Sequence, residues 1–173
     1  DDWLIDNDAF YIINEAYNKT GCDVLWTAHR WGYSGHNISG PMSPDADPYS
    51  HPWVTSHLKT FRKRLINSVP DENFRGPDGE YIKRAGDRAI YLPVLWKSKK
   101  RVFLPLQTYH YNIPLDKPEI FSSEDAIFQK SEADFLSRRG YVEWIIRVRY
   151  LIILCMKNAQ GNELIDVAEY KEV

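Results

Sequence analysis

The feature that most constrains this fold is a helix-forming segment that stops at a glycine and leads straight into an apolar strand. Residues 8–19 are predicted to form an amphipathic helix, because apolar side chains recur there at helical spacing. Gly21 stops it, since glycine readily adopts the conformation that ends helices. Residues 23–28 then have the pattern of a strand. A helix followed directly by a strand favours an α/β fold.

Later segments extend the same α/β pattern. Residues 61–68 are predicted to form a short helix, and residues 86–96 a second one with Asp87 as its N-cap and Pro93 bending it or ending it early. Residues 102–106 and 107–111 have strand patterns. Residues 123–139 form a helix that opens on a capping box and stops at Gly140. For residues 141–156 helix and strand both stay open, and the last residues either pair back as a strand or form a final helix.

Charge and composition exclude several classes of protein. The chain has 22 Lys and Arg against 24 Asp and Glu, so we expect no nucleic-acid partner. Two short basic runs, 62–64 and 97–101, are best interpreted as solvated, although the second could lie near a phosphate or an anionic membrane surface. The two cysteines are too few for a disulfide framework, and we expect Cys155 to be a buried thiol. No signal peptide or membrane span is apparent, which favours a cytoplasmic location.

The long segment 30–52 is rich in Gly, Pro, Ser and Asp and has no periodicity. Loops of this length in compact domains are usually functional or disordered, so a lid, an acceptor-binding loop and a floppy insertion all stay open. Aromatic residues make up 14% of the chain. This surplus suits a carbohydrate site, where flat rings stack on sugars, or equally a core or an interface.

Acidic residues open the chain, and a second acidic group lies in its middle. Asp1 and Asp2 are followed by Asp6 and Asp8, a cluster that would suit a hard cation such as Mg²⁺ or Mn²⁺, or simply a solvated terminus. Asp87, at a helix start, is a candidate general base or a plain cap. Asp78, in the turn 75–79, belongs to the same acidic region. The polar and aromatic run 107–112 could line a sugar pocket or form an edge strand.

The order of these segments resembles the family 2 glycosyltransferases of the GT-A fold. In that family a strand ends in an acidic motif, often Asp-Gly-Asp-Asp-Trp, and an amphipathic helix follows. Residues 1–10 resemble the end of that motif and its helix, residues 60–63 a later stretch, residues 85–93 the motif of the catalytic base, and residues 109–112 a closing strand. Because the chain starts without Met and within the motif, we expect it to be cut from a longer protein.

The resemblance implies an α/β fold, a partial three-layer GT-A domain with a mixed sheet over residues 1–140 and a tail of uncertain structure over 141–173. It implies an inverting transfer of sugar from a nucleotide-diphosphate sugar donor to a sugar or glycoconjugate acceptor, in polysaccharide or glycoconjugate assembly. Asp1 and Asp2 would bind the donor and the Mg²⁺ or Mn²⁺, and Asp87 would be the base. The acceptor-binding candidates are Trp53, His29, His110 and Asp78.

Two departures from the family are visible. Gly86 precedes Asp87 where the family has a second acidic residue, and the strands that bind the nucleoside base would lie before residue 1. Three other interpretations stay open: a nucleotidyltransferase, although the chain has no basic Gly-rich phosphate loop near its start; a noncatalytic carbohydrate-binding or interaction module; and an inactive fragment of a transferase.

Overall fold

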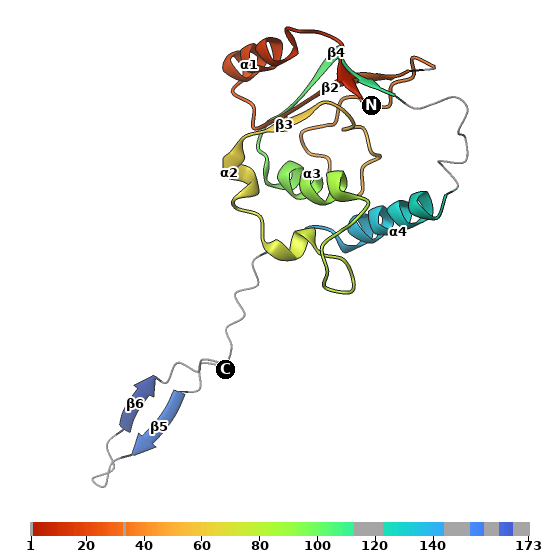
Figure 1. Cartoon of the computed structure of the whole chain (residues 1–173). Helices are drawn as coiled ribbons and strands as arrows, with labels where there is room; N and C mark the ends of the chain where they lie inside the picture. Colours follow the sequence, from red (N-terminus) through yellow and green to blue (C-terminus); the bar gives the residue numbers. More distant parts are fainter. Residues whose placement is uncertain (1, 33, 113–122, 144–152, 158–162, 168–173) are drawn as a thin grey trace. The chain divides into compact units, whose positions relative to one another are not determined.

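The computed structural model describes residues 2–32, 34–112, 123–143, 153–157 and 163–167, and it divides into two units, Asp1–Val142 and Glu143–Val173. In the first unit the described residues form an α/β protein with one four-stranded, mixed, strongly curled sheet and four α-helices (Figure 1). The elements are β1 (Trp3–Leu4), α1 (Ala9–Thr20), β2 (Val24–Trp31), β3 (Lys59–Phe61), α2 (Lys63–Ile66), the 3₁₀ helix η1 (Asp71–Phe74), α3 (Gly86–Lys97), β4 (Arg101–Tyr111) and α4 (Glu124–Arg139).

The sheet has the strand order β1-β4-β2-β3. Strands β2 and β4 pair in parallel over their whole length, and the two outer pairings are antiparallel. The register shifts twice in the parallel pair, between Thr27 and His29. The parallel pairing places the carboxyl ends of β2 and β4 at the same edge of the sheet, and Trp31 of β2 lies opposite Tyr111 of β4.

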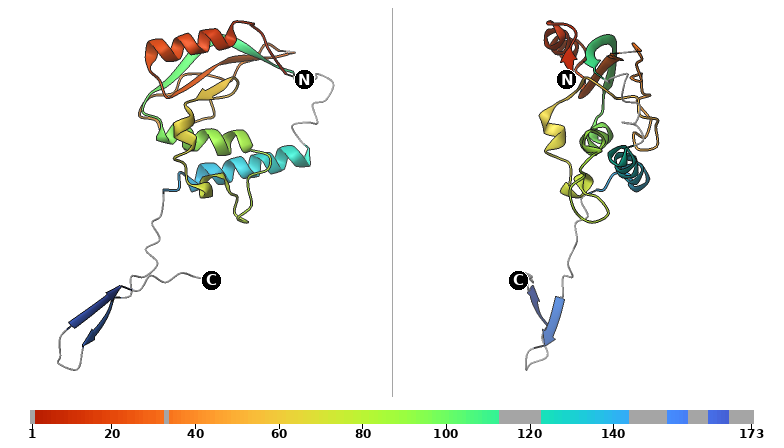
Figure 2. Two further views of the ribbon diagram at one scale, coloured as in Figure 1. Left: turned by 60° about the vertical axis from the view of Figure 1, so that its left-hand side comes forward. Right: turned by 45° about the vertical axis from the view of Figure 1, so that its right-hand side comes forward.

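Helices cover both faces of the sheet because side chains alternate along β2. Val24 and Trp26 pack against α3, whereas Leu25 packs against Ile13 of α1. Figure 1 shows α1 and α3 on opposite sides of the strands, and Figure 2 shows α4 lying beside α3. The contact between α3 and α4 is apolar and includes Leu92 and Leu136.

Helix α4 also holds the segment before α3 with a buried carboxylate. Glu132 is only 8% exposed, and its two oxygens accept the backbone N–H groups of Lys83, Arg84 and Ala85 at 2.9, 2.7 and 2.9 Å. Burial raises the pKa of Glu132, but the three backbone hydrogen bonds outweigh it and leave the pKa below its ordinary value. These N–H groups precede the first turn of α3, so Glu132 fixes where that helix begins.

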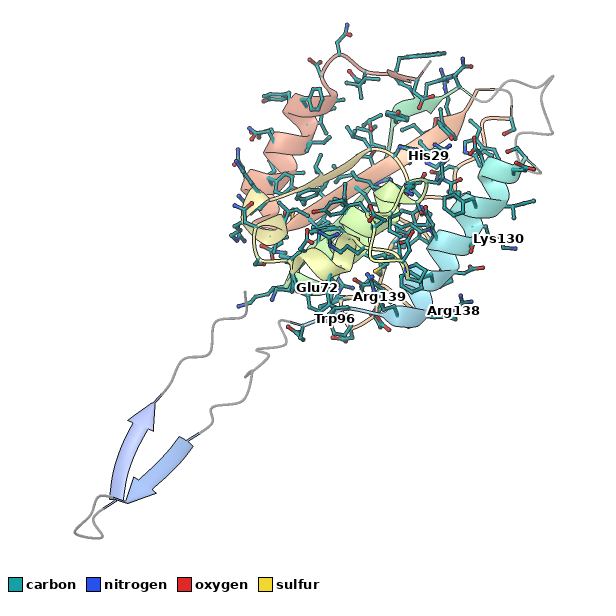
Figure 3. All side chains as sticks on the ribbon, turned by 60° about the horizontal axis from the view of Figure 1, so that its bottom comes forward. His29, Glu72, Trp96, Lys130, Arg138 and Arg139 are labelled. Atoms are coloured by element: carbon teal, nitrogen blue, oxygen red, sulfur yellow. The ribbon has the colours of Figure 1, made fainter. Side chains whose placement is uncertain are left out.

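Arg139, near the end of α4, holds the other end of the same segment. Its guanidinium donates to the backbone carbonyls of Glu72, Asn73 and Arg75 at 3.0, 2.8 and 2.6 Å. Figure 3 labels Arg139 beside Glu72. The segment from η1 to α3 has little regular structure, so these charged contacts replace the ladder hydrogen bonds that would otherwise satisfy its backbone.

Several predicted elements are confirmed. The first helix ends at Gly21, whose φ is 65°, and the fourth is capped by Ser123, which accepts the N–H of Ala126 at 3.2 Å. In the second unit β5 (Ile153–Lys157) pairs antiparallel with β6 (Glu163–Val167), so residues 163–167 do pair back as a strand. Residues 144–152, the predicted turn 158–162 and the side chain of Cys155 lie outside the described residues.

Other predictions are wrong in detail. The cap of α3 is Ala85, and Asp87 lies in the first turn, because the helical hydrogen bonds already begin with the N–H of Ala89 donating to the carbonyl of Ala85. Pro93 does not end α3, which continues to Lys97 with buried neighbours on both sides of the proline. Residues 101–111 form one strand instead of two, and Phe61 belongs to β3 instead of a helix. Among the described residues no helix is long and apolar enough to cross a membrane.

We predict that Glu132→Gln destabilises the protein by about 1–3 kcal/mol, because an amide offers one acceptor oxygen and turns two donors toward backbone N–H groups. Urea unfolding at pH 7 measures this loss. The control is Glu124→Gln, an exposed residue of the same helix, which should change stability by only a few tenths of a kcal/mol.

The Glu132→Gln substitution should also change how the stability of the protein depends on pH in the acid range. Since the folded pKa of Glu132 lies below its ordinary value, the stabilisation is complete above about pH 4.5 and is lost as the pH falls through the folded value. The wild-type protein should therefore lose stability there more steeply than Glu132→Gln. Equal acid profiles for the two proteins would contradict this role of Glu132.

Candidate functional site

A cavity of about 660 Å³ lies between the loop after β2, the start of α3, the end of β4 and one face of α4. Helix α4 contributes residues spaced three or four apart, so a single stripe of this helix faces the cavity. Figure 3 labels Lys130, which lies on that stripe. The lining residues are Trp31, Ile38, Trp53, Ser56, His57, Arg84, Ala85, Asp87, Arg88, Tyr111, Ala126, Gln129, Lys130, Ala133 and Asp134.

Asp87 is the lining residue with the strongest motif in the sequence. It is exposed in the first turn of α3, and its Oδ2 lies 3.0 Å from the Nζ of Lys59. Its Oδ1 accepts the backbone N–H of Arg88 at 2.8 Å. The helix N-terminus and the ammonium group both stabilise the negative charge of this carboxylate. A carboxylate has about four acceptor positions, so two remain for a ligand hydroxyl.

An aromatic stack leads from the cavity to the beginning of the chain. The ring of His57 stacks on Tyr109, with centroids 4.7 Å apart and 15° between the planes, and lies 5.1 Å from the ring of Tyr111. The hydroxyl of Tyr109 donates to Oδ2 of Asp2 at 2.8 Å, and the backbone N–H of Asn112 donates to Oδ1 at 2.9 Å. Asp2 is thus held by Tyr109, whose ring stacks on His57, and His57 and Tyr111 line the cavity.

Electrostatic interactions link the same groups. Burial lowers the pKa of His57 and Lys59 lowers it further, while Asp87 and Asp2 both raise it. Asp2 and Asp87, although far apart in the sequence, therefore both lie close enough to His57 to act on its imidazole. Burial and the bond to Asp2 raise the pKa of Tyr109 to about 12, so its hydroxyl stays a donor at neutral pH.

One wall of the cavity combines the aromatic ring of Trp53 with the guanidinium group of Arg88. The guanidinium carbon of Arg88 lies 4.8 Å from the Trp53 ring centre, and the Nζ of Lys59 lies 5.3 Å from it. Burial lowers the pKa of Arg88, and Asp87 and Asp134 oppose that shift. Trp53 is half-buried and packs on the core under α3. Its ring positions cations in addition to any contact with a sugar.

His29 supports the stack from below without reaching the cavity lining. It is fully buried in β2, its Nδ1 lies 3.1 Å from the Oγ of Ser39, and its ring meets that of His57 edge-on at 5.9 Å. Its Nε2 is buried and has no hydrogen-bond partner in the part of the chain that the structure describes. Burial, followed by the charge of His57, lowers the pKa of His29 to about 4, so this residue is neutral at pH 7.

The remaining sequence candidates lie elsewhere. His110 is buried and stacks on Trp3 at 3.7 Å, and its Nδ1 accepts the Nε–H of Arg30 at 3.2 Å. Asp78 lines a separate cavity of about 130 Å³, and its carboxylate accepts the N–H of Glu80 at 3.1 Å. Asp1 lies outside the described residues. The structure therefore brings Asp2, Trp53 and Asp87 to one region and sets Asp78 apart from them.

The described residues include no group of three or more His, Cys, Asp or Glu side chains that could hold a metal ion by themselves. Asp2 has one hydrogen bond on each carboxylate oxygen and no ion pair among the described residues. Both oxygens thus keep a free lone pair. Mg²⁺ is commonly held by one or two carboxylates when substrate phosphates and water complete its shell, and Asp2 fits that limited role.

Comparison of the chain with protein-family models, with curated proteins and with solved structures gives no match.

Several residues of the site have only a weak signal in the sequence. His57 is one of five scattered histidines, and Arg88 and Lys59 resemble ordinary surface cations. A usable signal is the alternation of Tyr109 and Tyr111, because residues two apart lie on the same face of a strand. The contribution of α4 has no motif at all, since it depends on how α4 packs on α3.

We predict that stability falls between pH 6.5 and pH 4 and that His29→Leu reduces this fall. A histidine whose folded pKa lies near 4 stabilises the fold above pH 6.5 and loses up to about 3 kcal/mol of that contribution as the pH drops to 4. Urea unfolding at several pH values measures the slope. Part of this slope should remain in His29→Leu, because the pKa of His57 is also lowered.

The control for this pH series is His51→Gln, at a half-exposed residue of the loop before Trp53. It should retain the slope of the wild-type protein. A His29→Leu protein with the same slope as the wild type would show that His29 does not stay neutral in the folded state.

Proposed function

We propose that the chain is the carboxyl-terminal half of a GT-A glycosyltransferase that moves a sugar from a nucleotide-diphosphate donor to an acceptor hydroxyl. The observation that carries this proposal is the convergence of Asp2 and Asp87. These residues match two motifs of the family 2 glycosyltransferases, and both act electrostatically on His57, whose ring stacks on Tyr109.

Asp87 is the base in this proposal. It lies on the wall of a cavity large enough for a sugar unit, with free acceptor positions on an ionised carboxylate. The acceptor hydroxyl would donate its proton to Asp87 as its oxygen attacks the anomeric carbon of the donor. The bond between that carbon and the phosphate oxygen breaks, and the nucleoside diphosphate leaves with the bonding electrons. A single displacement of this kind inverts the anomeric configuration.

Asp2 belongs to the donor side. Together with Asp1 it would hold a Mg²⁺ or Mn²⁺ ion, which when bound would supply positive charge beside the leaving diphosphate. Tyr109 and the N–H of Asn112 keep the Asp2 carboxylate in place. Because both of these hydrogen-bond donors are neutral, they leave the net negative charge of Asp2 unbalanced. This favours a cation at this position.

The walls of the cavity suit a polar, ring-shaped acceptor. Trp53, Trp31 and Tyr111 supply flat apolar surface, and Gln129, Ser56 and Asp134 supply polar groups. Such a mixture suits sugars, whose faces are apolar and whose edges carry hydroxyls. A noncatalytic carbohydrate-binding module would use the same walls, and it remains the alternative function because it needs neither Asp2 nor Asp87.

We predict that Asp87→Asn lowers the rate of sugar transfer by roughly 10²–10⁴-fold, because an amide cannot take the acceptor proton. Transfer from UDP-sugars to a panel of sugar acceptors, in the longest form of the protein that can be prepared, measures this rate. The matched control is Asp78→Asn, a carboxylate that lines the separate cavity of about 130 Å³. It should retain most of the rate.

Binding of the acceptor separates the two candidate functions. A transferase should keep its acceptor affinity in Asp87→Asn while turnover is lost. If the wild-type protein binds sugars but transfers none with any donor, and Asp87→Asn changes nothing, then the binding module is the correct function.

We predict that UDP binds with a Kd at least tenfold lower in the presence of Mn²⁺ and that Asp2→Asn abolishes this gain, since an amide is a poorer ligand for a hard cation. Isothermal titration calorimetry with and without Mn²⁺ measures both values. Asp8→Asn, an exposed acidic residue nearby, is the control and should behave like the wild type. If UDP binds equally well without Mn²⁺, the metal is removed from the proposal, but the role proposed for Asp87 as the base is unaffected.

A further inference from the structure

The two basic runs of the sequence meet at one end of the sheet. Residues 62–64 surround the beginning of α2, residues 97–101 connect α3 to β4, and both lie beside the start of β2. Together with the end of α1 they form a group of exposed cations, here called the cationic end. Its members are Lys19, Lys63, Arg64, Lys99 and Lys100.

A buried carboxylate brings these runs together. Asp23, only 7% exposed, accepts the backbone N–H groups of Lys99 and Lys100 at 2.9 and 3.2 Å. Its other oxygen is hydrogen-bonded to the guanidinium of Arg64. The carbonyl of Asp23 accepts the N–H of Arg62 at 2.9 Å. Asp23 therefore fixes both runs through their backbones and leaves the lysine side chains to solvent.

Few carboxylates balance this end of the molecule. Lys19 has a partner in Glu15 at 3.8 Å, and Arg64 has one in Asp23. Lys63 and Lys99 have no ion pair among the described residues, and the Nζ of Lys100 donates to the carbonyl of Thr20 at the end of α1. The whole chain has a net charge of -2, so this local excess is offset by acidic residues elsewhere.

We infer that the cationic end binds an anionic membrane surface. Clusters of four to eight Lys and Arg side chains are what attracts a protein to acidic lipid headgroups. The cations are exposed and gathered at one end of the sheet, around the start of β2. A nucleic acid needs a basic stripe or groove along the protein, and the acidic residues elsewhere in this chain would repel a long polyanion.

This surface lies away from the candidate site. Strand β2 begins beside the cationic end and finishes at Trp31, which lines the cavity, a separation of roughly 23 Å at the usual rise of a strand. A protein bound to a bilayer through its cationic end would keep the cavity open to water. The inference is independent of the proposed function, because none of the five cations lines the cavity.

The experiment is sedimentation of the full chain with vesicles of phosphatidylcholine, with and without phosphatidylserine. The test variant is Lys63→Gln combined with Lys99→Gln, since neither side chain has an ion pair or hydrogen bond among the described residues and the backbone bonds to Asp23 remain. We expect binding only to the acidic vesicles, with a partition coefficient roughly 25-fold lower in the variant, about fivefold for each charge removed. Salt should weaken the binding.

The matched control is Lys83→Gln combined with Lys130→Gln, which removes two exposed cations near the other end of α3. It should bind acidic vesicles like the wild type, and thermal unfolding should show that both double variants are folded. Absence of binding to acidic vesicles, or an equal loss in both double variants, would overturn the inference. Equally tight binding of a single-stranded RNA, lost in the test variant, would assign the surface to nucleic acid instead.

Discussion

Helix α4 determines the position of the candidate site through two side chains of opposite charge. Glu132 accepts three backbone N–H groups just before α3, and Arg139 donates to three backbone carbonyls around η1. Each charge is matched to the polarity of the backbone groups it meets, so a segment of little regular structure is fixed at both ends. Asp87 and Arg88 follow directly after the segment that Glu132 holds. Their position relative to the α4 residues of the cavity is therefore set by one helix that contributes to both.

The sheet determines the other half of the site. The parallel pairing of β2 with β4 brings His29 under the region where Tyr109 and Tyr111 emerge, and the register shifts at Thr27 to His29 occur where the site begins. Bulges of this kind commonly redirect side chains at the ends of sheets. The hydroxyls of Thr27 and Thr108 lie 2.6 Å apart in the buried centre of this pair. Polar groups inside the sheet are thus paired with each other, while the aromatic rings beyond them face the cavity.

Local patterns in the sequence predicted the four α-helices, the two central strands β2 and β4 and the α/β class, because apolar spacing and the capping residues Ser123 and Gly21 depend only on nearby residues. The short strands β1 and β3 were not predicted. Sequence alone assigned Asp87 to the cap of α3, and that was wrong because the cap is Ala85, whose N–H is held by Glu132 of α4 and whose carbonyl accepts the N–H of Ala89. The same limit applies to the site. Asp2 and Asp87 could be singled out by motif, but His57 and the stripe of α4 depend on long-range packing that no local pattern encodes.

The two carboxylates of the site differ in how their charge is balanced, and this difference suits two distinct chemical roles. Asp87 has a cationic partner in Lys59, so its negative charge is balanced without any ligand. Asp2 is held by a neutral hydroxyl and a backbone N–H, and no cation pairs with it among the described residues. His57 lies near both, but burial and Lys59 lower its pKa, so it adds no positive charge at neutral pH. One carboxylate near His57 therefore has its charge balanced by a lysine, and the other has no cationic partner among the described residues and is open to an external cation.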